Sequence, residues 1–255
     1  MCKTVLKYLV PVLILRCCFR MPRRVAYHWK LDSPREFPAA IAVTLIVFAV
    51  ANVWLLFSPV NFLSSSTLGE AYYTVSYMRR SYQIVYLVFE VLAISICKEL
   101  LLHGDMLHVL RQFGDWDAVI LTAVVAVCLS HSCTTILMEL TFSLVSGVAV
   151  LRSGSVVPAI FCRLLYHVML FGLFAMEIWQ SSFWQAYCLL FLFLVLIAGI
   201  LLCLLSIRPT RKNPALLTQK HYLTLRERLY TVMHVGPLSI VLILCVILMV
   251  IEVIF

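Results

Sequence analysis

Residues 82–110 read YQIVYLVFEVLAISICKELLLHGDMLHVL, and this stretch decides the class of fold. Its run Tyr82–Leu102 is almost wholly apolar and is long enough, as a helix, to cross a hydrocarbon core of about 30 Å. Lys98, Glu99 and His103 nevertheless lie at its end. A charged group at bilayer depth is costly and normally faces the protein interior or a wet cavity. These side chains are therefore candidates for a functional site.

The whole chain has the same apolar character. Of its 255 residues 63% are hydrophobic and 13% are charged, against about 25% charged residues in soluble domains. The sequence therefore predicts an integral membrane protein. Further apolar runs long enough to cross a membrane are Pro38–Phe57, Ala118–Met138, Val156–Met176, Phe183–Ser206 and Pro237–Phe255.

A shorter apolar run, Leu140–Val150, follows the third of these segments. The stretch Ala118–Leu151 is too long for one crossing and short for two, and Glu139 interrupts it. It predicts a helix pair with a tight turn, in which 140–150 either spans the membrane or re-enters it. We expect an all-α, polytopic transmembrane helical bundle of about seven segments, because lipid tolerates no open strand edges. It forms one domain, 38–255, after a basic segment, 1–37.

The positive charges support seven segments. Residues 1–37 hold eight Lys and Arg and residues 207–236 hold six, and such clusters mark cytoplasmic flanks. Seven segments put both clusters on one side, whereas six would separate them. The net charge of +8 comes mainly from these two clusters. We expect them to orient the chain in the membrane and to contact anionic membrane lipids, and we expect no nucleic-acid partner.

No cofactor or metal is expected. Most cysteines lie in apolar runs without a C-x-x-C pair, and the chain has no Walker loop or dinucleotide fingerprint. Glu99, His103, His108 and His131 are metal ligands by residue type, but His103 and His108 are five apart and point differently on a helix.

Two further segments carry ionisable groups inside apolar runs. Arg163 and His167 repeat the four-residue spacing of Glu99 and His103, and His131 lies alone on a third segment. Residues four apart share a helix face. In the seven-segment topology Arg163 lies about 10 Å and His131 about 20 Å from the inner boundary. With Glu99 near that boundary, all three can line one cavity open to the inside.

The order of these motifs resembles the CAAX-protease and bacteriocin-processing family of intramembrane peptidases, whose eukaryotic member is the type II CAAX prenyl endopeptidase. The family pattern is EExxxR, then FxxxH, then HxxxN or HxxxD after a turn that often reads T-G-S-L-x-x-P. Here 98–104 (K-E-L-L-L-H-G) is similar to the first motif and 127–131 (V-C-L-S-H) to the second. The turn corresponds to 153–158 (S-G-S-V-V-P), and 163–167 stands at the third motif. The resemblance implies a peptidase-like core at about 82–206.

The departures from the pattern concern its reactive positions. The resemblance implies that the first glutamate and the FxxxH histidine activate a water, while the other motif residues support the oxyanion and the fold. Lys98 replaces that first glutamate, His103 the arginine, Arg163 the last histidine and His167 the asparagine; only Glu99 and His131 are unchanged. A lysine repels the proton that a general base must accept, so we expect an inactive or weakened site. A rescue would need Glu99 or His167 as base, with Arg163 or Lys98 stabilising the oxyanion.

Structural roles compete with this interpretation. Glu99 and His103 can form an ion pair at a helix end, His131 can bond a neighbouring helix, and Arg163 can pair with Glu90, Glu99 or Glu139. The sequence leaves that partner open.

Three hypotheses follow for function. The first is a catalytically impaired relative of the peptidases that acts as a scaffold, binding or assembly subunit, with other membrane-complex subunits as partners. The second is an active, divergent endopeptidase that cuts a lipidated or membrane-proximal peptide. The third is an unrelated subunit of a membrane complex. The resemblance implies the endoplasmic reticulum or another internal membrane; the Arg-containing N-terminus, free of acidic residues to Lys30, keeps the mitochondrial inner membrane as an alternative.

Overall fold

The described part of the chain consists of helices joined by short turns. The computed structural model describes residues 9–14, 36–57, 80–129, 136–178 and 183–206, together with Cys17, Trp29 and single residues between 227 and 247. No strand occurs within these ranges. The predicted all-α class is therefore confirmed for the residues that are described.

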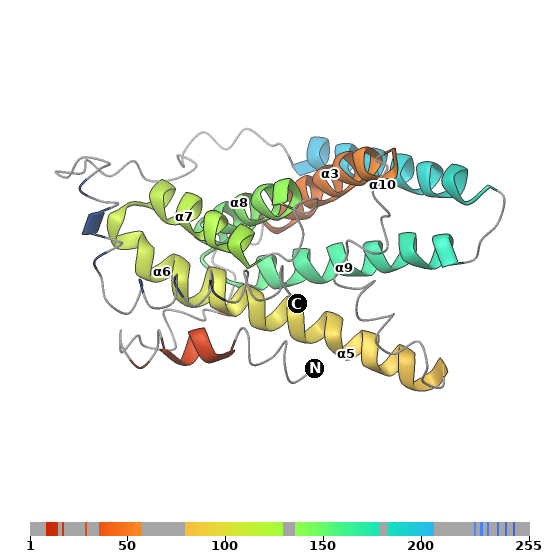
Figure 1. Cartoon of the computed structure of the whole chain (residues 1–255). Helices are drawn as coiled ribbons and strands as arrows, with labels where there is room; N and C mark the ends of the chain where they lie inside the picture. Colours follow the sequence, from red (N-terminus) through yellow and green to blue (C-terminus); the bar gives the residue numbers. More distant parts are fainter. Residues whose placement is uncertain are drawn as a thin grey trace.

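Six longer helices lie in the described ranges (Figure 1): α3 (Glu36–Leu56), α5 (Arg80–Glu99), α7 (Asp115–Cys128), α8 (Ile136–Ser153), α9 (Val157–Ile178) and α10 (Trp184–Ser206). Three short elements join α5 to α7, namely the π-helix η1 (Leu100–Met106), α6 (Leu107–Leu110) and the 3-10 helix η2 (Arg111–Phe113). Figure 1 shows that α5, η1 and α6 follow one another as a single long rod. This rod carries the first family-like motif.

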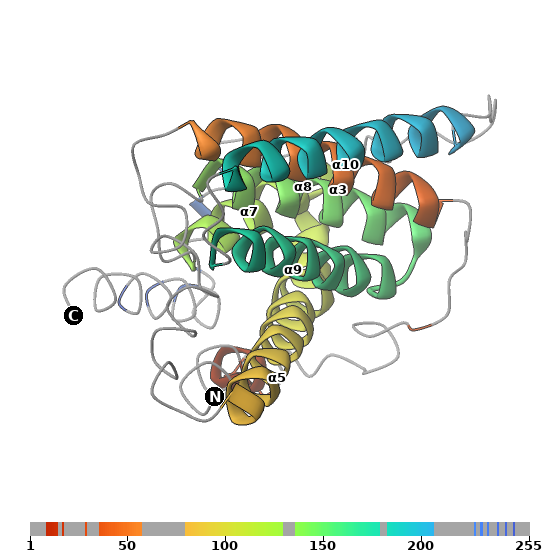
Figure 2. The same cartoon turned by 90° about the vertical axis from the view of Figure 1, so that its right-hand side faces the viewer.

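Helix α8 lies at the centre of the packing, against α7, α3 and α9, while α5 packs on α9 and α10 packs on α3. The last pair lies side by side in both views (Figures 1 and 2). Its close approach depends on Gly199, where a Cβ would lie 2.9 Å from Cγ1 of Ile46 and 3.2 Å from the carbonyl oxygen of Ala42. Small residues allow such approach between membrane helices.

Two contacts fix the directions of three helices. At the start of α3, Glu36 accepts a hydrogen bond from Nη2 of Arg152, near the end of α8, at 3.0 Å. Gly199 lies near the end of α10 and touches Ala42 near the start of α3. Consequently α3 begins where α8 and α10 end. The chain therefore enters α3 and leaves α10 at the same end of the bundle.

Among the described residues, two helices are long and apolar enough to cross a membrane, Glu36–Val53 in α3 and Trp184–Ser206 in α10. Helix α9 contributes a shorter apolar stretch, Val157–Leu173. Seven crossings are therefore not confirmed and stay a prediction. The expected segment Pro237–Phe255 lies almost wholly outside the described residues, as does most of the basic segment 1–37.

The expected helix pair between 118 and 151 is present, but its boundaries differ from the prediction. Helix α7 ends at Cys128, well short of Met138, and α8 already begins at Ile136. Glu139 lies in the first turn of α8 and does not interrupt a helix. The physical reason is that its carboxylate pairs with two cations of neighbouring helices.

The turn before α9 is held by serine side chains. Gly154 adopts a φ of 69°, in the left-handed region that favours glycine. Ser153 Oγ donates to the Ser155 carbonyl at 3.1 Å, and Ser155 Oγ accepts from the Val157 N–H at 3.2 Å, as a helix-capping side chain does. Pro158 fits the first turn that follows. The turn thus fixes where α9 starts and hence the position of Arg163.

Candidate functional site

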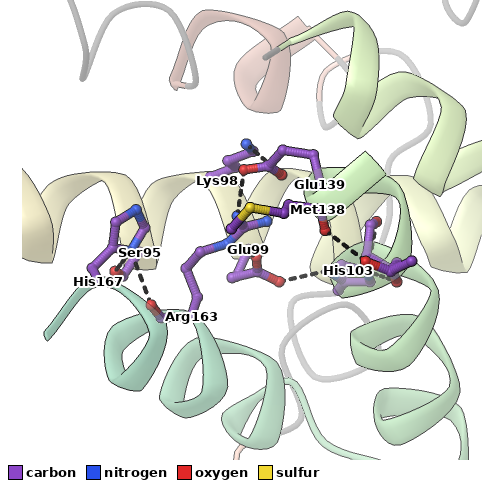
Figure 3. A network of polar contacts seen from close by, with 10 residues as sticks. Ser95, Lys98, Glu99, His103, Met138, Glu139, Arg163 and His167 are labelled. Carbon is purple, nitrogen blue, oxygen red and sulfur yellow. Dashed lines mark hydrogen bonds and ion pairs between the residues drawn. The ribbon is translucent and has the colours of Figure 1, made fainter. Parts of the chain in front are cut away.

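Glu99, the last residue of α5, is at the centre of a buried polar network (Figure 3). Its side chain is 0% exposed. Nε of Arg163, from α9, donates to Oε1 at 2.7 Å, and Nδ1 of His103, from η1, lies 2.5 Å from Oε2. Hydrogen bonds between charged groups are about twice as strong as neutral ones. Both oxygens of Glu99 are thus engaged by strong donors.

Arg163 joins Glu99 to a second carboxylate. Its Nη1 donates to Oε1 of Glu139 at 2.8 Å, and its guanidinium carbon lies 4.2 Å from the ring centre of Phe142, both residues of α8. This is within the range of a cation–π interaction. Nη2 is buried and has no hydrogen-bond partner among the described residues. Arg163 therefore connects α9 to α5 and α8 and keeps one donor unused.

Lys98 completes an alternation of charge. Its Nζ lies 2.9 Å from Oε2 of Glu139. Lys98, Glu139, Arg163 and Glu99 thus follow one another as cation, carboxylate, cation and carboxylate. Two positive groups are balanced by two negative ones inside the bundle, which is the condition for keeping charges away from water.

His103 joins this network to the backbone of α8. Its Nε2 lies 3.1 Å from the carbonyl oxygen of Ser143 and 3.4 Å from Ser143 Oγ, and the histidine is fully buried. A carboxylate faces one ring nitrogen and a carbonyl the other, and both groups accept hydrogen bonds. The two ring nitrogens thus link the carboxylate of Glu99 to α8. His103 also lies in a π-helix, an uncommon element that is frequent at functional sites.

His167 and Ser95 form a separate buried contact beside the network. Nδ1 of His167 lies 2.9 Å from the carbonyl oxygen of Arg163 and 3.1 Å from Ser95 Oγ. Because a carbonyl only accepts, Nδ1 carries the proton and cannot take one from the Ser95 hydroxyl. The pair is therefore not the hydroxyl-to-base arrangement of a serine nucleophile.

The structure brings together most of the residues that the sequence selects. Lys98, Glu99, His103 and Arg163 lie in one network, and His167 adjoins it through the Arg163 carbonyl. Arg163 takes two of the carboxylates that were considered as its partner, Glu99 and Glu139. His131 lies outside the described residues, so its predicted place at the site stays a prediction.

Glu139, Ser95 and Ser143 belong to the site but were not predicted as site residues from the sequence. Glu139 meets the criterion that selected the others, a charge within an apolar run, and could have been found by it. Ser95 and Ser143 carry no such signal, because serine is common in transmembrane helices. Their roles follow only from the packing of α5 against α9 and of α8 against η1.

The network limits the chemistry of these groups. A general base needs an acceptor directed at a water or substrate proton, and both oxygens of Glu99 instead receive donors. Glu99 and Arg163 are 0% and 1% exposed and face each other. Within the described ranges, no three His, Cys, Asp or Glu residues lie close enough to hold a metal ion.

Comparison with known families agrees with the motif order. Residues 80–169 match the family described as type II CAAX prenyl endopeptidase Rce1-like, and this confirms the resemblance seen in the sequence. The match covers less than half of the chain but includes Lys98, Glu99, His103, Glu139, Arg163 and His167. No curated protein and no solved structure matches the chain. The family match and the two apolar helices indicate a membrane protein of the CAAX-protease type.

Proposed function

We propose that this chain is a catalytically impaired relative of the CAAX-type endopeptidases that acts as a scaffold, binding or assembly subunit in a membrane. One observation carries the proposal. The carboxylate of Glu99 is fully buried and both of its oxygens are occupied by Arg163 and His103. The adjacent position, a glutamate in the family pattern, is Lys98, whose ammonium is itself paired with Glu139.

The balance of charges also favours a structural role. The pairs join α5 to α8 and α9, two helices that lie well beyond it in the sequence. Activating a water at Glu99 would require breaking a buried ion pair, and a buried charge without its partner is strongly unfavourable. The site is thus better suited to holding helices together than to proton transfer.

A second function has one observation in its favour. Nη2 of Arg163 is a buried donor without a partner in the described part of the chain, and such a donor could stabilise an oxyanion. Together with the family match, this donor supports the alternative function. In that alternative the chain is an active, divergent endopeptidase that acts on a prenylated or membrane-proximal peptide. The proposed membrane for either function is the endoplasmic reticulum or another internal membrane, with lipids as direct contacts.

A hydrolysis assay separates the two functions. The purified full chain, in lipid nanodiscs, is incubated with a farnesylated CAAX peptide beside an active type II CAAX endopeptidase. We expect no release of the terminal tripeptide. Cleavage by the wild-type chain that is lost in Glu99→Gln and in His131→Ala would overturn the proposal and establish the alternative.

Co-purification tests the subunit role itself. The tagged chain is extracted from its native membrane in mild detergent, and the bound proteins are quantified. We expect a membrane protein in stoichiometric amount. A chain that elutes alone, at the mass of a monomer with its detergent, would contradict an assembly role.

A further inference from the structure

Glu139 differs from the other charged residues of the network in its place and exposure. It lies on α8, outside the three family-like motifs, and its side chain is 14% exposed, compared with 5% for Lys98 and 1% for Arg163. It is also the carboxylate that meets two formal cations, Lys98 at 2.9 Å and Arg163 at 2.8 Å. These cations come from α5 and α9, so Glu139 joins three helices through one side chain.

We infer that Glu139 is the shared counter-ion that makes Lys98 possible inside the bundle and positions the guanidinium of Arg163 on Glu99. A guanidinium presents its donors in a fixed plane. With Nη1 bound to Glu139 and the plane lying over Phe142, Nε is directed at Oε1 of Glu99. In the family pattern a second glutamate stands on α5 at the position of Lys98. In this chain Glu139 supplies a second carboxylate from α8 instead.

The four charges form two neutral pairs, Lys98–Glu139 and Arg163–Glu99. Removing one charge of the first pair has a different cost at each of its two positions. Without Glu139, Lys98 has lost its ion-pair partner at 5% exposure, while Arg163 still has Glu99. Without Lys98, Glu139 still has Arg163 and is itself closer to water. When Lys98 and Glu139 are both neutral, the pair Arg163–Glu99 remains balanced. Loss of Glu139 alone is therefore the most damaging of the three changes, and neutralising Lys98 as well restores stability.

This inference concerns how three helices are held and does not depend on whether the chain hydrolyses peptides. Its test is a double-mutant cycle on the full chain in detergent, with Glu139→Gln, Lys98→Met and the double variant. Thermal unfolding is followed by the exposure of cysteine thiols. We expect Glu139→Gln to lower the unfolding midpoint by roughly 10 °C, Lys98→Met to lower it less, and the double variant to lie above Glu139→Gln.

Two further variants keep the test decisive. Glu139→Asp retains the charge with a shorter side chain and should recover part of the loss. Glu36→Gln removes a carboxylate from the more exposed pair with Arg152 and should change the midpoint little. A double variant as unstable as Glu139→Gln, or one that fails to fold, would overturn the inference. So would a Glu139→Gln protein whose midpoint equals that of Glu36→Gln.

Discussion

Arg163 on α9 and Glu99 at the end of α5 lie 64 positions apart in the sequence, yet Nε of the arginine is 2.7 Å from Oε1 of the glutamate. Both side chains are buried, at 1% and 0% exposure. Removing charges from water is expensive, and the expense is offset only when pairing and hydrogen bonds are nearly complete. Here the pairing is extended by His103 and Glu139 until every formal charge of the network has an opposite neighbour.

The first prediction concerns Glu99. Glu99→Gln keeps the shape but leaves Arg163 with one carboxylate in place of two. Removing one partner of a buried ion pair costs about 3–5 kcal/mol, and we expect a loss of stability of that size in thermal unfolding. Glu36→Gln is the matched control, because it makes the same change in the more exposed pair with Arg152. Its cost should stay below about 1 kcal/mol. Equal losses in the two variants would contradict a special role for the buried pair.

The second prediction concerns the shape of the cation at 163. Arg163 uses Nε for Glu99 and Nη1 for Glu139, in a fork that an ammonium cannot reproduce. Arg163→Lys should therefore lose at least one charged hydrogen bond, which is worth about 1.5–3 kcal/mol, although the charge is unchanged. Denaturation in detergent measures the loss. Arg152→Lys, at a single exposed bond, is the control and should be nearly neutral. If Arg163→Lys is neutral as well, the guanidinium geometry is not required.

Most charged residues of the network could be predicted from the sequence, but their pairing could not. Hydropathy and the cost of buried charge were sufficient to select Lys98, Glu99, His103, Arg163 and His167, because each is ionisable and lies in or next to an apolar run. Motif order was sufficient to indicate the family, which the match over 80–169 confirms. The partner of Arg163 was not predictable, because three glutamates satisfied the same charge argument. Only the packing of α9 against both α5 and α8 selects Glu99 and Glu139.

The helix boundaries could not be predicted from the local apolar pattern. An apolar run that continues past Cys128 indicates a longer helix than α7, whose last residue is Cys128. Likewise, Glu139 suggests an interruption when it is considered alone, whereas within the bundle it is neutralised by Lys98 and Arg163 and stays in α8. Local pattern fixes the class of element, but tertiary ion pairs decide where a charged residue is tolerated.

The third prediction concerns the contact between α3 and α10. A methyl group added at Gly199 would lie 3.0 Å from Cβ of Leu45 and 3.2 Å from the carbonyl oxygen of Ala42, which is too close for either to stay in place. Gly199→Ala should therefore push the helices apart and cost about 1–3 kcal/mol, as overpacking does. Ala198→Val adds bulk at the neighbouring, exposed position of α10 and is the control. Unfolding midpoints of the two variants in the same detergent give the comparison. A stable Gly199→Ala protein would mean that α3 and α10 pack less closely than these distances indicate.

The last prediction concerns the number of crossings. The start of α3 and the end of α10 lie at one end of the bundle, so residues 1–37 and 207–236 should face the same compartment. If Pro237–Phe255 then crosses once more, a cysteine placed after Phe255 should face the opposite side.

Maleimide labelling of single cysteines measures these positions. The cysteines are introduced as Lys30→Cys, as Lys212→Cys and after Phe255, in a background without exposed native cysteines, and are labelled with a membrane-impermeant maleimide in sealed vesicles. We expect the cysteines at positions 30 and 212 to react from the cytoplasmic side alone, and the terminal cysteine from the other side alone. Labelling of all three from one side would mean that Pro237–Phe255 does not cross the membrane, and labelling of positions 30 and 212 from opposite sides would contradict the antiparallel arrangement of α3 and α10.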